Sequence, residues 1–181
     1  MRVAIIEAGE ESGRLFAYAN TIEAELSEMS VDARLFSLRS LSVKPCLGCF
    51  SCMFRTPGVC VRGDDGDMLL REFLAADRVL FLYPLCRGFM GPMAKDFVDR
   101  LFPLELPYIE FRDGAMTHMM RYDRYPELGF VVGLEEGGMK AEFEIAAELN
   151  RRLACSYRSS IFINAEDSIE PKEVAHAIVH D

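Results

Sequence analysis

Long apolar runs are missing from this sequence, and so is any excess of basic residues. No stretch of the 181 residues approaches the roughly twenty consecutive apolar residues that a membrane-spanning helix needs. The 29 acidic residues outnumber the 20 basic ones and give a net charge of −9, whereas nucleic acids and anionic membranes attract basic surfaces. We therefore expect a protein that binds neither nucleic acid nor a membrane.

Histidines are also few and scattered. His118, His176 and His180 form no zinc-binding pattern, and no Ser–His–Asp order indicates a hydrolase. At the N-terminus Glu7 follows a short apolar run, whereas a signal peptide needs a longer apolar region and a small-residue cleavage site. We expect a cytoplasmic location, where cysteines serve metal or redox chemistry more often than disulfides.

Cysteine, by contrast, is concentrated in one segment. The string PCLGCFSCMFRTPGVC holds Cys46, Cys49, Cys52 and Cys60 in the spacing C-x2-C-x2-C-x7-C. Four thiolates hold iron–sulfur clusters, and ferredoxin-type sequences also begin with C-x2-C-x2-C. We predict a 4Fe-4S cluster on these four residues. The alternatives are a regulatory or redox thiol group without metal, zinc held by four thiolates, and disulfides.

Short apolar segments alternate with amphipathic segments along the chain. The pattern predicts strands at residues 3–7, 33–38, 78–84, 129–134 and 159–165, and helices at residues 12–30, 65–76, 91–102, 139–153 and 171–180. Apolar strands flanked by helices form parallel sheets that are covered on both faces. We predict an α/β fold, a three-layer sandwich with a five-stranded parallel sheet, as a single domain over residues 1–181.

Two segments interrupt this alternation. The cysteine loop spans residues 45–63. Residues 103–127 contain three prolines and several aromatic residues without a helical period, and they are too long for a plain connection. We predict an irregular insertion here, which serves as a hairpin, a lid over a site or an oligomer contact.

Two strings carry a resemblance to a known family. KPCLGCFSCMFRTPGVCVRGDDGDM joins the cysteine loop to a charged stretch with Asp64 and Asp65, and AADRVLFLYPLCRGFMGPMAKDFVDRLF joins a strand to a helix with Lys95, Asp99 and Arg100. In content and order these strings resemble the iron–sulfur flavoprotein branch of the NADPH-dependent FMN reductase family. The resemblance covers nearly all of the chain. It implies a flavodoxin-like fold and a homodimer or homotetramer.

The resemblance also implies that FMN is bound by the loops after the first, third and fourth strands, beyond the carboxyl ends of the sheet. The residues assigned to FMN in this way are Ser12, Gly13, Arg14, Pro84, Leu85, Cys86, Arg87, Gly88, Phe89, Gly137 and Gly138. No catalytic residue is assigned. Glu7, Glu10 and Glu11 depart from the family pattern, in which this loop is neutral or basic. Each carboxylate a few ångströms from the phosphate raises the free energy of binding by on the order of 1 kcal/mol, even at high dielectric.

The function that the resemblance implies is electron transfer between FMN and a 4Fe-4S cluster, in an NAD(P)H-dependent FMN reductase-like oxidoreductase. Its partner is then NAD(P)H or a redox protein such as ferredoxin. One alternative is a flavodoxin-like protein without FMN that acts as a thiol- or metal-sensing or binding module. Another is a quinone or nitro-compound reductase that uses FMN without a cluster. Flavin content distinguishes the binding module from the two flavin-dependent proteins. Iron and sulfide content distinguishes the protein with a cluster from the reductase without one.

Overall fold

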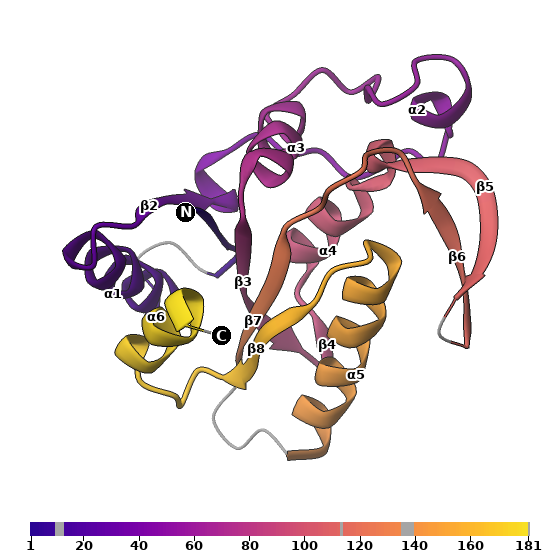
Figure 1. Cartoon of the computed structure of the whole chain (residues 1–181). Coiled ribbons are helices and arrows are strands. Elements are labelled where there is room, and N and C mark those ends of the chain that lie inside the picture. The colour runs from indigo at the N-terminus through magenta and orange to yellow at the C-terminus, as the bar shows by residue number, and fades with distance from the viewer. Residues whose placement is uncertain (10–12, 113, 135–139, 181) are drawn as a thin grey trace.

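Five parallel strands form the central sheet, which a computed structural model describes within residues 1–9, 13–112, 114–134 and 140–180 (Figure 1). The strands are β1 (Arg2–Glu7), β2 (Asp32–Ser37), β3 (Arg78–Cys86), β7 (Glu127–Gly133) and β8 (Ile161–Glu166). They run in the order β2-β1-β3-β7-β8, and the short β4 (Phe89–Met90) pairs antiparallel to β3. The prediction of an α/β fold with a five-stranded parallel sheet is confirmed.

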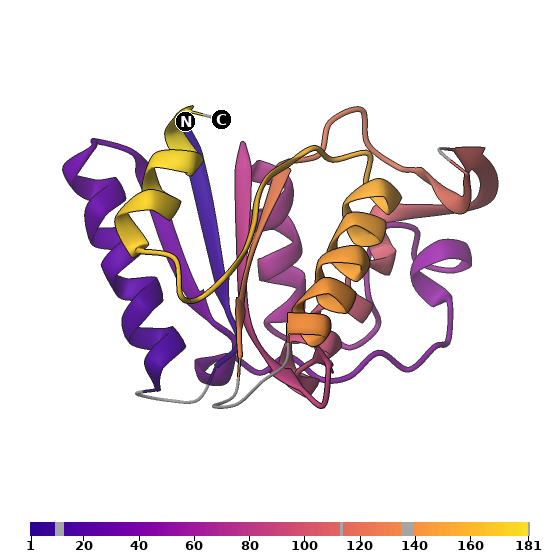
Figure 2. The same ribbon diagram turned by 90° about the horizontal axis from the view of Figure 1, so that it is seen from below.

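Helices cover both faces of this sheet (Figure 2). α1 (Arg14–Glu28) and α6 (Pro171–His180) pack on one face, and α3 (Gly66–Ala75), α4 (Pro92–Asp99) and α5 (Lys140–Ser156) pack on the other. Because successive strand residues point to opposite faces, β1 sends Val3 and Ile5 toward α1 and α6, and Ala4 and Ile6 toward the other layer. Among the described helices, none is long and apolar enough to cross a membrane.

The strand order reverses between β1 and β3. From β1 the chain moves outward to β2 and then returns to β3 on the other side of β1, after which it continues toward β7 and β8. The loops at the carboxyl ends of β1 and β3 therefore lead in opposite directions. In parallel sheets of this order such a switch point leaves a crevice in which ligands bind.

Residues 103–127 are more regular than the sequence predicted. After the short helix η2 (Phe102–Leu104), β5 (Glu105–Arg112) and β6 (Ala115–Met120) form an antiparallel hairpin beside the main sheet. The pairing shifts register between Glu105 and Ile109, around Pro107, which has no N–H to donate. Of the alternatives for this segment, the hairpin is the one that the structure shows. The prolines interrupt the alternation of apolar and polar residues by which its strands would have been recognised. Its roles as a lid or an oligomer contact stay predictions.

The cysteine loop, residues 45–63, lies in the connection between β2 and α3. This connection begins with the short helix η1 (Leu38–Ser40), and the loop contains one helical turn, α2 (Ser51–Phe54). α2 lies against η2 and β5, so the outer end of the loop contacts the hairpin (Figure 1).

Candidate functional site

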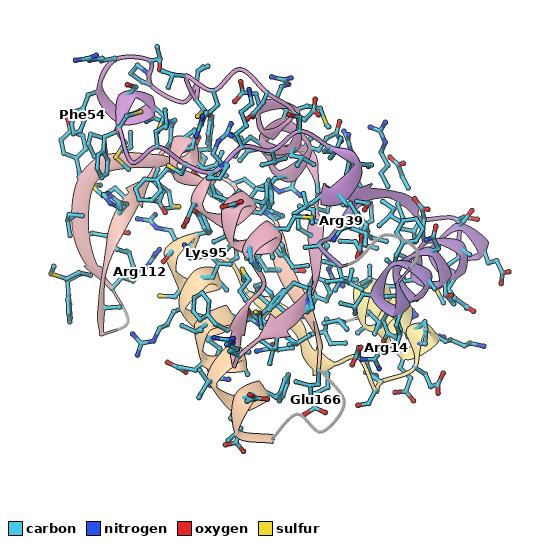
Figure 3. All side chains as sticks on the ribbon, turned by 180° about the vertical axis from the view of Figure 1, so that it is seen from behind. Arg14, Arg39, Phe54, Lys95, Arg112 and Glu166 are labelled. Atoms are coloured by element: carbon cyan, nitrogen blue, oxygen red, sulfur yellow. The ribbon has the colours of Figure 1, made fainter. Side chains whose placement is uncertain are left out.

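The two predicted binding regions lie at different ends of the molecule. Figure 3 shows Arg14, the first residue of α1, at one end, and Phe54, from the cysteine loop, at the other. Each region has its own pocket, and the two pockets have no lining residue in common. The chain therefore carries two candidate sites that can be tested separately.

The first site is a pocket of about 420 Å³ at the carboxyl ends of β1, β3 and β7. Its volume falls in the range of roughly 300–1,000 Å³ that is common for small-molecule sites. The lining residues are Gly9, Gly13, Arg14, Leu15, Pro84, Leu85, Cys86, Gly91, Pro92, Gly133 and Leu134. The pocket lies where the strand order reverses, as expected for an open parallel sheet.

Residues that the sequence assigned to FMN fall into three groups in this structure. Those that line the pocket are Gly13, Arg14, Pro84, Leu85 and Cys86. Those at the tip of the β3–β4 hairpin, outside the lining, are Arg87, Gly88 and Phe89. Those that lie outside the described residues are Ser12, Gly137 and Gly138.

A tight turn explains the placement of the second group. Arg87 and Gly88 connect β3 to β4 with φ angles of +53° and +75°. Two positive φ angles in a row match the two-residue type I′ turn, whose twist suits a β-hairpin. Glycine adopts this conformation readily, so Gly88 has a backbone role that needs no ligand.

Two glycines that the sequence analysis did not single out bring the pocket walls together. A Cβ atom on Gly133, at the end of β7, would lie 2.7 Å from Cδ1 of Leu15. A Cβ atom on Gly91, just before α4, would lie 3.1 Å from the carbonyl oxygen of Pro84. Their positions at the ends of predicted elements were the available signal, but only the packing shows why each must be small.

The charge of Arg14 is balanced within the protein. Its guanidinium lies 2.5 Å from the carboxylate of Asp167, which is 4% exposed, and donates to the carbonyl oxygen of Leu134 at 3.1 Å. The pKa of the nearby Tyr18 is raised, first by burial and then by the negative charge of Asp167. Arg14 therefore contributes less free positive charge to the pocket than its position alone suggests.

The pocket fits the ring system of a flavin better than the phosphate of FMN. Leu15, Leu85, Leu134 and the two prolines give it apolar walls suited to an aromatic ring system. In the loop after β1, however, the backbone N–H of Gly9 donates to the buried carboxylate of Glu7. An N–H group at this place in the fold is what a phosphate would otherwise bind.

The second site is a small cavity in the cysteine loop. Its lining residues are Cys46, Leu47, Gly48, Cys49, Phe50, Cys52, Cys60, Val61, Arg62 and Phe102. All four predicted cysteine ligands thus line one cavity, and all are free thiols. Its volume is about 40 Å³, close to the roughly 30 Å³ that a water molecule occupies in the liquid.

The thiols influence one another's ionisation. Burial raises the pKa of Cys52 to about 11, and the neighbouring Cys60, Cys46 and Cys49 add to the effect. The pKa of Cys49 is lowered, first by a hydrogen bond from the backbone N–H of Ser51. Ionising all four thiols together is unfavourable unless positive charge is placed among them.

The thiols do not form a ready-made ion site. Within the described ranges, no group of three or more His, Cys, Asp or Glu side chains is arranged to hold a metal ion. A single zinc ion needs four ligands converging at about 2.3 Å. The prediction of an iron–sulfur cluster therefore rests on the donor set and on the shared cavity, and it remains a proposal.

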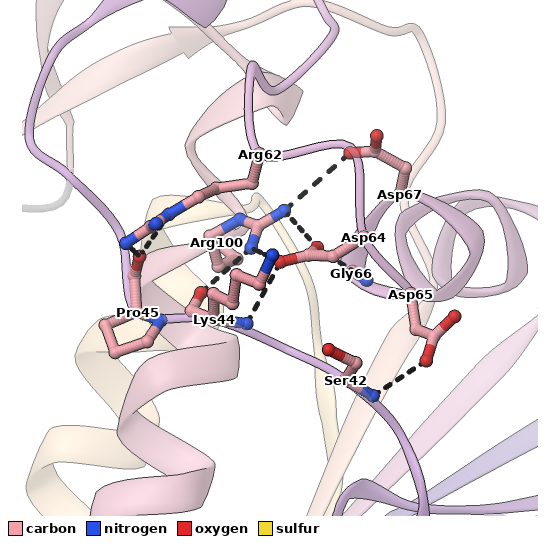
Figure 4. Close-up of polar contacts among 9 residues, drawn as sticks. All are labelled: Ser42, Lys44, Pro45, Arg62, Asp64, Asp65, Gly66, Asp67 and Arg100. Atoms are coloured by element: carbon pink, nitrogen blue, oxygen red, sulfur yellow. Dashed lines mark hydrogen bonds and ion pairs between the residues drawn. The ribbon is translucent and has the colours of Figure 1, made fainter.

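Arg100 closes the base of the cysteine loop (Figure 4). Its side chain is completely buried and donates to the two carboxylate oxygens of Asp64 at 2.9 and 2.8 Å, and to the carbonyl oxygen of Lys44 at 2.9 Å. Asp64 also accepts from the backbone N–H groups of Lys44 and Gly66. A Cβ atom on Gly66 would lie 2.8 Å from the guanidinium of Arg100, so this position has room only for glycine.

Further hydrogen bonds join the two segments at the base of the cysteine loop, residues 42–45 and 62–66, which we call its legs. The carboxylate of Asp65 accepts from the backbone N–H of Ser42 at 2.7 Å. The guanidinium of Arg62 donates twice to the carbonyl oxygen of Pro45, at 2.9 and 2.7 Å. The charged residues that carry part of the family resemblance therefore have a structural role here, since they hold the legs of the cysteine loop together (Figure 4).

The outer end of the loop is attached to the hairpin. Arg121, just after β6, donates to the carbonyl oxygen of Glu105 at 2.8 Å and to that of Cys52 at 3.4 Å. The ring of Phe102 meets Phe50 edge-on, with 5.8 Å between centroids. The cysteine cavity is therefore held from both ends, by Arg100 at the base and by Arg121 at the tip.

Comparisons with known proteins agree on the fold. No protein-family model matches this sequence, and a search of curated proteins finds no match. Solved structures do match: a flavone reductase (16% identity, TM-score 0.65, 98% of this chain), a flavodoxin from Streptococcus pneumoniae TIGR4 (13%, 0.57, 98% of this chain and 97% of that one), and the apo form of an NADH:FMN oxidoreductase (14%, 0.59, 99% and 88%). This chain spans only 59% of the flavone reductase chain. At these identities the likeness establishes a flavodoxin-like α/β fold.

Proposed function

We propose that this chain is a flavin-dependent oxidoreductase. The observation that carries the proposal is the pocket of about 420 Å³ at the β1–β3 switch point of a flavodoxin-like sheet. The similarity of fold to a flavone reductase and to an NADH:FMN oxidoreductase supports it. By the same analogy, NAD(P)H is the proposed electron donor.

A flavin supplies the hydride and electron chemistry when bound, and the protein supplies binding and orientation. In this pocket Pro84 and Leu85 offer an apolar wall from β3, and Leu134 offers another from the end of β7. Such walls hold an aromatic ring system in place and exclude water from one side of it. FMN is the flavin that the family resemblance implies, although the loop after β1 does not favour its phosphate.

Filling the pocket tests this assignment. Cys86 is exposed and lines the pocket, so Cys86→Trp adds a large ring without disturbing the buried core. We expect the affinity for flavin to fall by about tenfold or more, because the added side chain occupies ligand volume. Titration with quenching of flavin fluorescence measures it. Glu28→Trp, at the exposed end of α1, is the control. Flavin binding that Cys86→Trp leaves unchanged would place the flavin elsewhere.

We also propose that Cys46, Cys49, Cys52 and Cys60 hold an iron–sulfur cluster of the 4Fe-4S type. A cluster would give the protein a one-electron centre in addition to the flavin. The proposal is supported by the four-thiol donor set, which is the set such clusters require, and by the single cavity that the thiols line. Protein without iron and sulfide, but with flavin, would favour a plain flavin reductase. Protein without either would favour a thiol-sensing or binding module.

The surface around the cysteines suits an acidic redox protein such as a ferredoxin, which we propose as a second partner. Within residues 44–63 the sequence has three basic residues and no acidic one, in a chain of net charge −9. Exposed apolar side chains accompany them: Leu47, Phe50, Phe54, Val59 and Val61. An apolar surface with positive charge around it is complementary to a negatively charged partner.

Reversing one charge of this surface tests the partner. Arg55→Glu should slow electron exchange with a ferredoxin by about three- to tenfold at low salt, since charge complementarity mainly sets the association rate. The difference should shrink at high ionic strength, while turnover with NAD(P)H stays the same. Arg152→Glu, on the exposed surface of α5, is the control. Equal rates for Arg55→Glu and the unmodified protein at low salt would rule out docking on the cysteine loop.

A further inference from the structure

The most unusual feature of the candidate flavin pocket is a buried acid at its edge. Glu7 is the last residue of β1 and is only 1% exposed. Both of its carboxylate oxygens accept hydrogen bonds, Oε1 from the backbone N–H of Gly9 at 2.5 Å and Oε2 from the hydroxyl of Ser37 at 2.9 Å. A Cβ atom on Gly9 would lie 2.5 Å from Oε1, so the close approach of this carboxylate requires glycine.

This arrangement uses two of the groups that would otherwise bind an anion, the N–H of Gly9 and the guanidinium of Arg14. In a strand–loop–helix unit, the backbone N–H groups after the strand and at the helix start are the usual ligands of a phosphate. Here the N–H of Gly9, which lines the pocket, is already bonded to a carboxylate of the protein itself. The positive charge of Arg14 is likewise paired with Asp167. A phosphate entering near Gly9 would meet the buried carboxylate of Glu7, and the N–H of Gly9 would not be free to bind it.

We propose that the pocket selects a flavin without the 5′-phosphate, such as riboflavin, and that Glu7 is the residue that sets this preference. The inference rests on the proposed flavin function and adds the chemical class of the flavin. Like charges raise the free energy of a bound dianion, whereas they leave an uncharged ribityl chain unaffected.

Binding of two flavins to the purified protein tests the inference. Titrations with riboflavin and with FMN, followed by quenching of flavin fluorescence, should give a dissociation constant at least about tenfold lower for riboflavin. Glu7→Gln keeps the shape and removes the charge, so it should narrow this ratio. Glu28→Gln makes the same charge change on the exposed end of α1 and should leave the ratio unchanged.

The outcomes separate the inference from the function on which it rests. FMN that binds the unmodified protein as tightly as riboflavin overturns the selectivity and leaves the flavin function standing. A folded Glu7→Gln protein with an unchanged ratio overturns the role of Glu7. Failure to bind either flavin overturns the flavin function, and the inference with it. Should Glu7→Gln not fold, the ratio in the unmodified protein still decides the selectivity.

Discussion

Asp64→Ala is expected to lower the free energy of unfolding by about 3–5 kcal/mol, the usual cost of leaving a buried ionic partner uncompensated. Arg100 is completely buried, and Asp64 is the only carboxylate that it contacts through two hydrogen bonds among the described residues. The substitution also frees the N–H groups of Lys44 and Gly66. Urea denaturation followed by circular dichroism measures the loss.

A matched exposed pair provides the control. Asp99→Asn breaks the Lys95–Asp99 pair, whose side chains are about 40% exposed, and should cost no more than about 0.5 kcal/mol. The double variant Asp64→Leu/Arg100→Met should recover much of the stability, because it leaves no buried charge. A loss below about 1 kcal/mol in Asp64→Ala would mean that water reaches Arg100 and that the pair does not hold the loop.

The same pair gives a pH dependence with a definite sign. Hydrogen bonds from Arg100 are the main reason that the pKa of Asp64 falls from 3.8 to about 2 in the folded protein. Since the folded value is below the unfolded one, the stabilisation is complete above the unfolded pKa and is lost as the pH falls through the folded pKa. The stability difference between the unmodified protein and Asp64→Asn should therefore shrink between about pH 4 and pH 2.

Replacement of Cys52 should have the largest effect on cofactor content. The thiol of Cys52 is partly buried, and its pKa is raised by this burial and by the three other thiols of the loop. If the four cysteines hold a cluster, Cys52→Ala should remove nearly all iron and sulfide from protein purified without oxygen, along with the broad absorption near 400 nm. The unmodified protein should contain about four iron per chain.

The control for this experiment is a cysteine outside the loop. Cys155 lies in α5 and lines neither the cysteine cavity nor the candidate flavin pocket. Cys155→Ala should keep the iron, sulfide and flavin of the unmodified protein. Cys52→Ala should also keep its flavin, because the two pockets share no residue. Iron that persists in Cys52→Ala, or that is absent from all three proteins, would argue against the cluster.

The main elements of the fold could be predicted because burial repeats regularly in this sequence. In α1 the apolar residues at helical spacing, Leu15, Ala19, Ile22 and Leu26, are all buried. The three inner strands of the central sheet, β1, β3 and β7, are nearly continuous apolar runs, as strands covered on both faces must be. The β5–β6 hairpin could not be predicted in this way, because one of its strands contains Pro107 and both strands expose large apolar side chains to solvent.

Local sequence was less informative about what each candidate site residue does. The grouping of the four cysteines could be predicted from their spacing, and the structure places them around one cavity. The burial of Arg100 could not, since a charged residue at the end of a helix is normally exposed. Its partners, Asp64 and Lys44, are distant in sequence and meet it only because the cysteine loop returns to its starting point.

The two legs of the cysteine loop, residues 42–45 and 62–66, form a fixed base for the loop. Because these two segments are hydrogen-bonded to each other and to Arg100, the contacts at the base of the loop compensate the entropic cost of closing it. The part of the loop beyond this base is attached to the β5–β6 hairpin through Arg121, so changes there have little direct cost to the central sheet. The cysteine loop is thus structurally separable from the pocket at the β1–β3 switch point, so its cysteines can be replaced without changing the walls of that pocket.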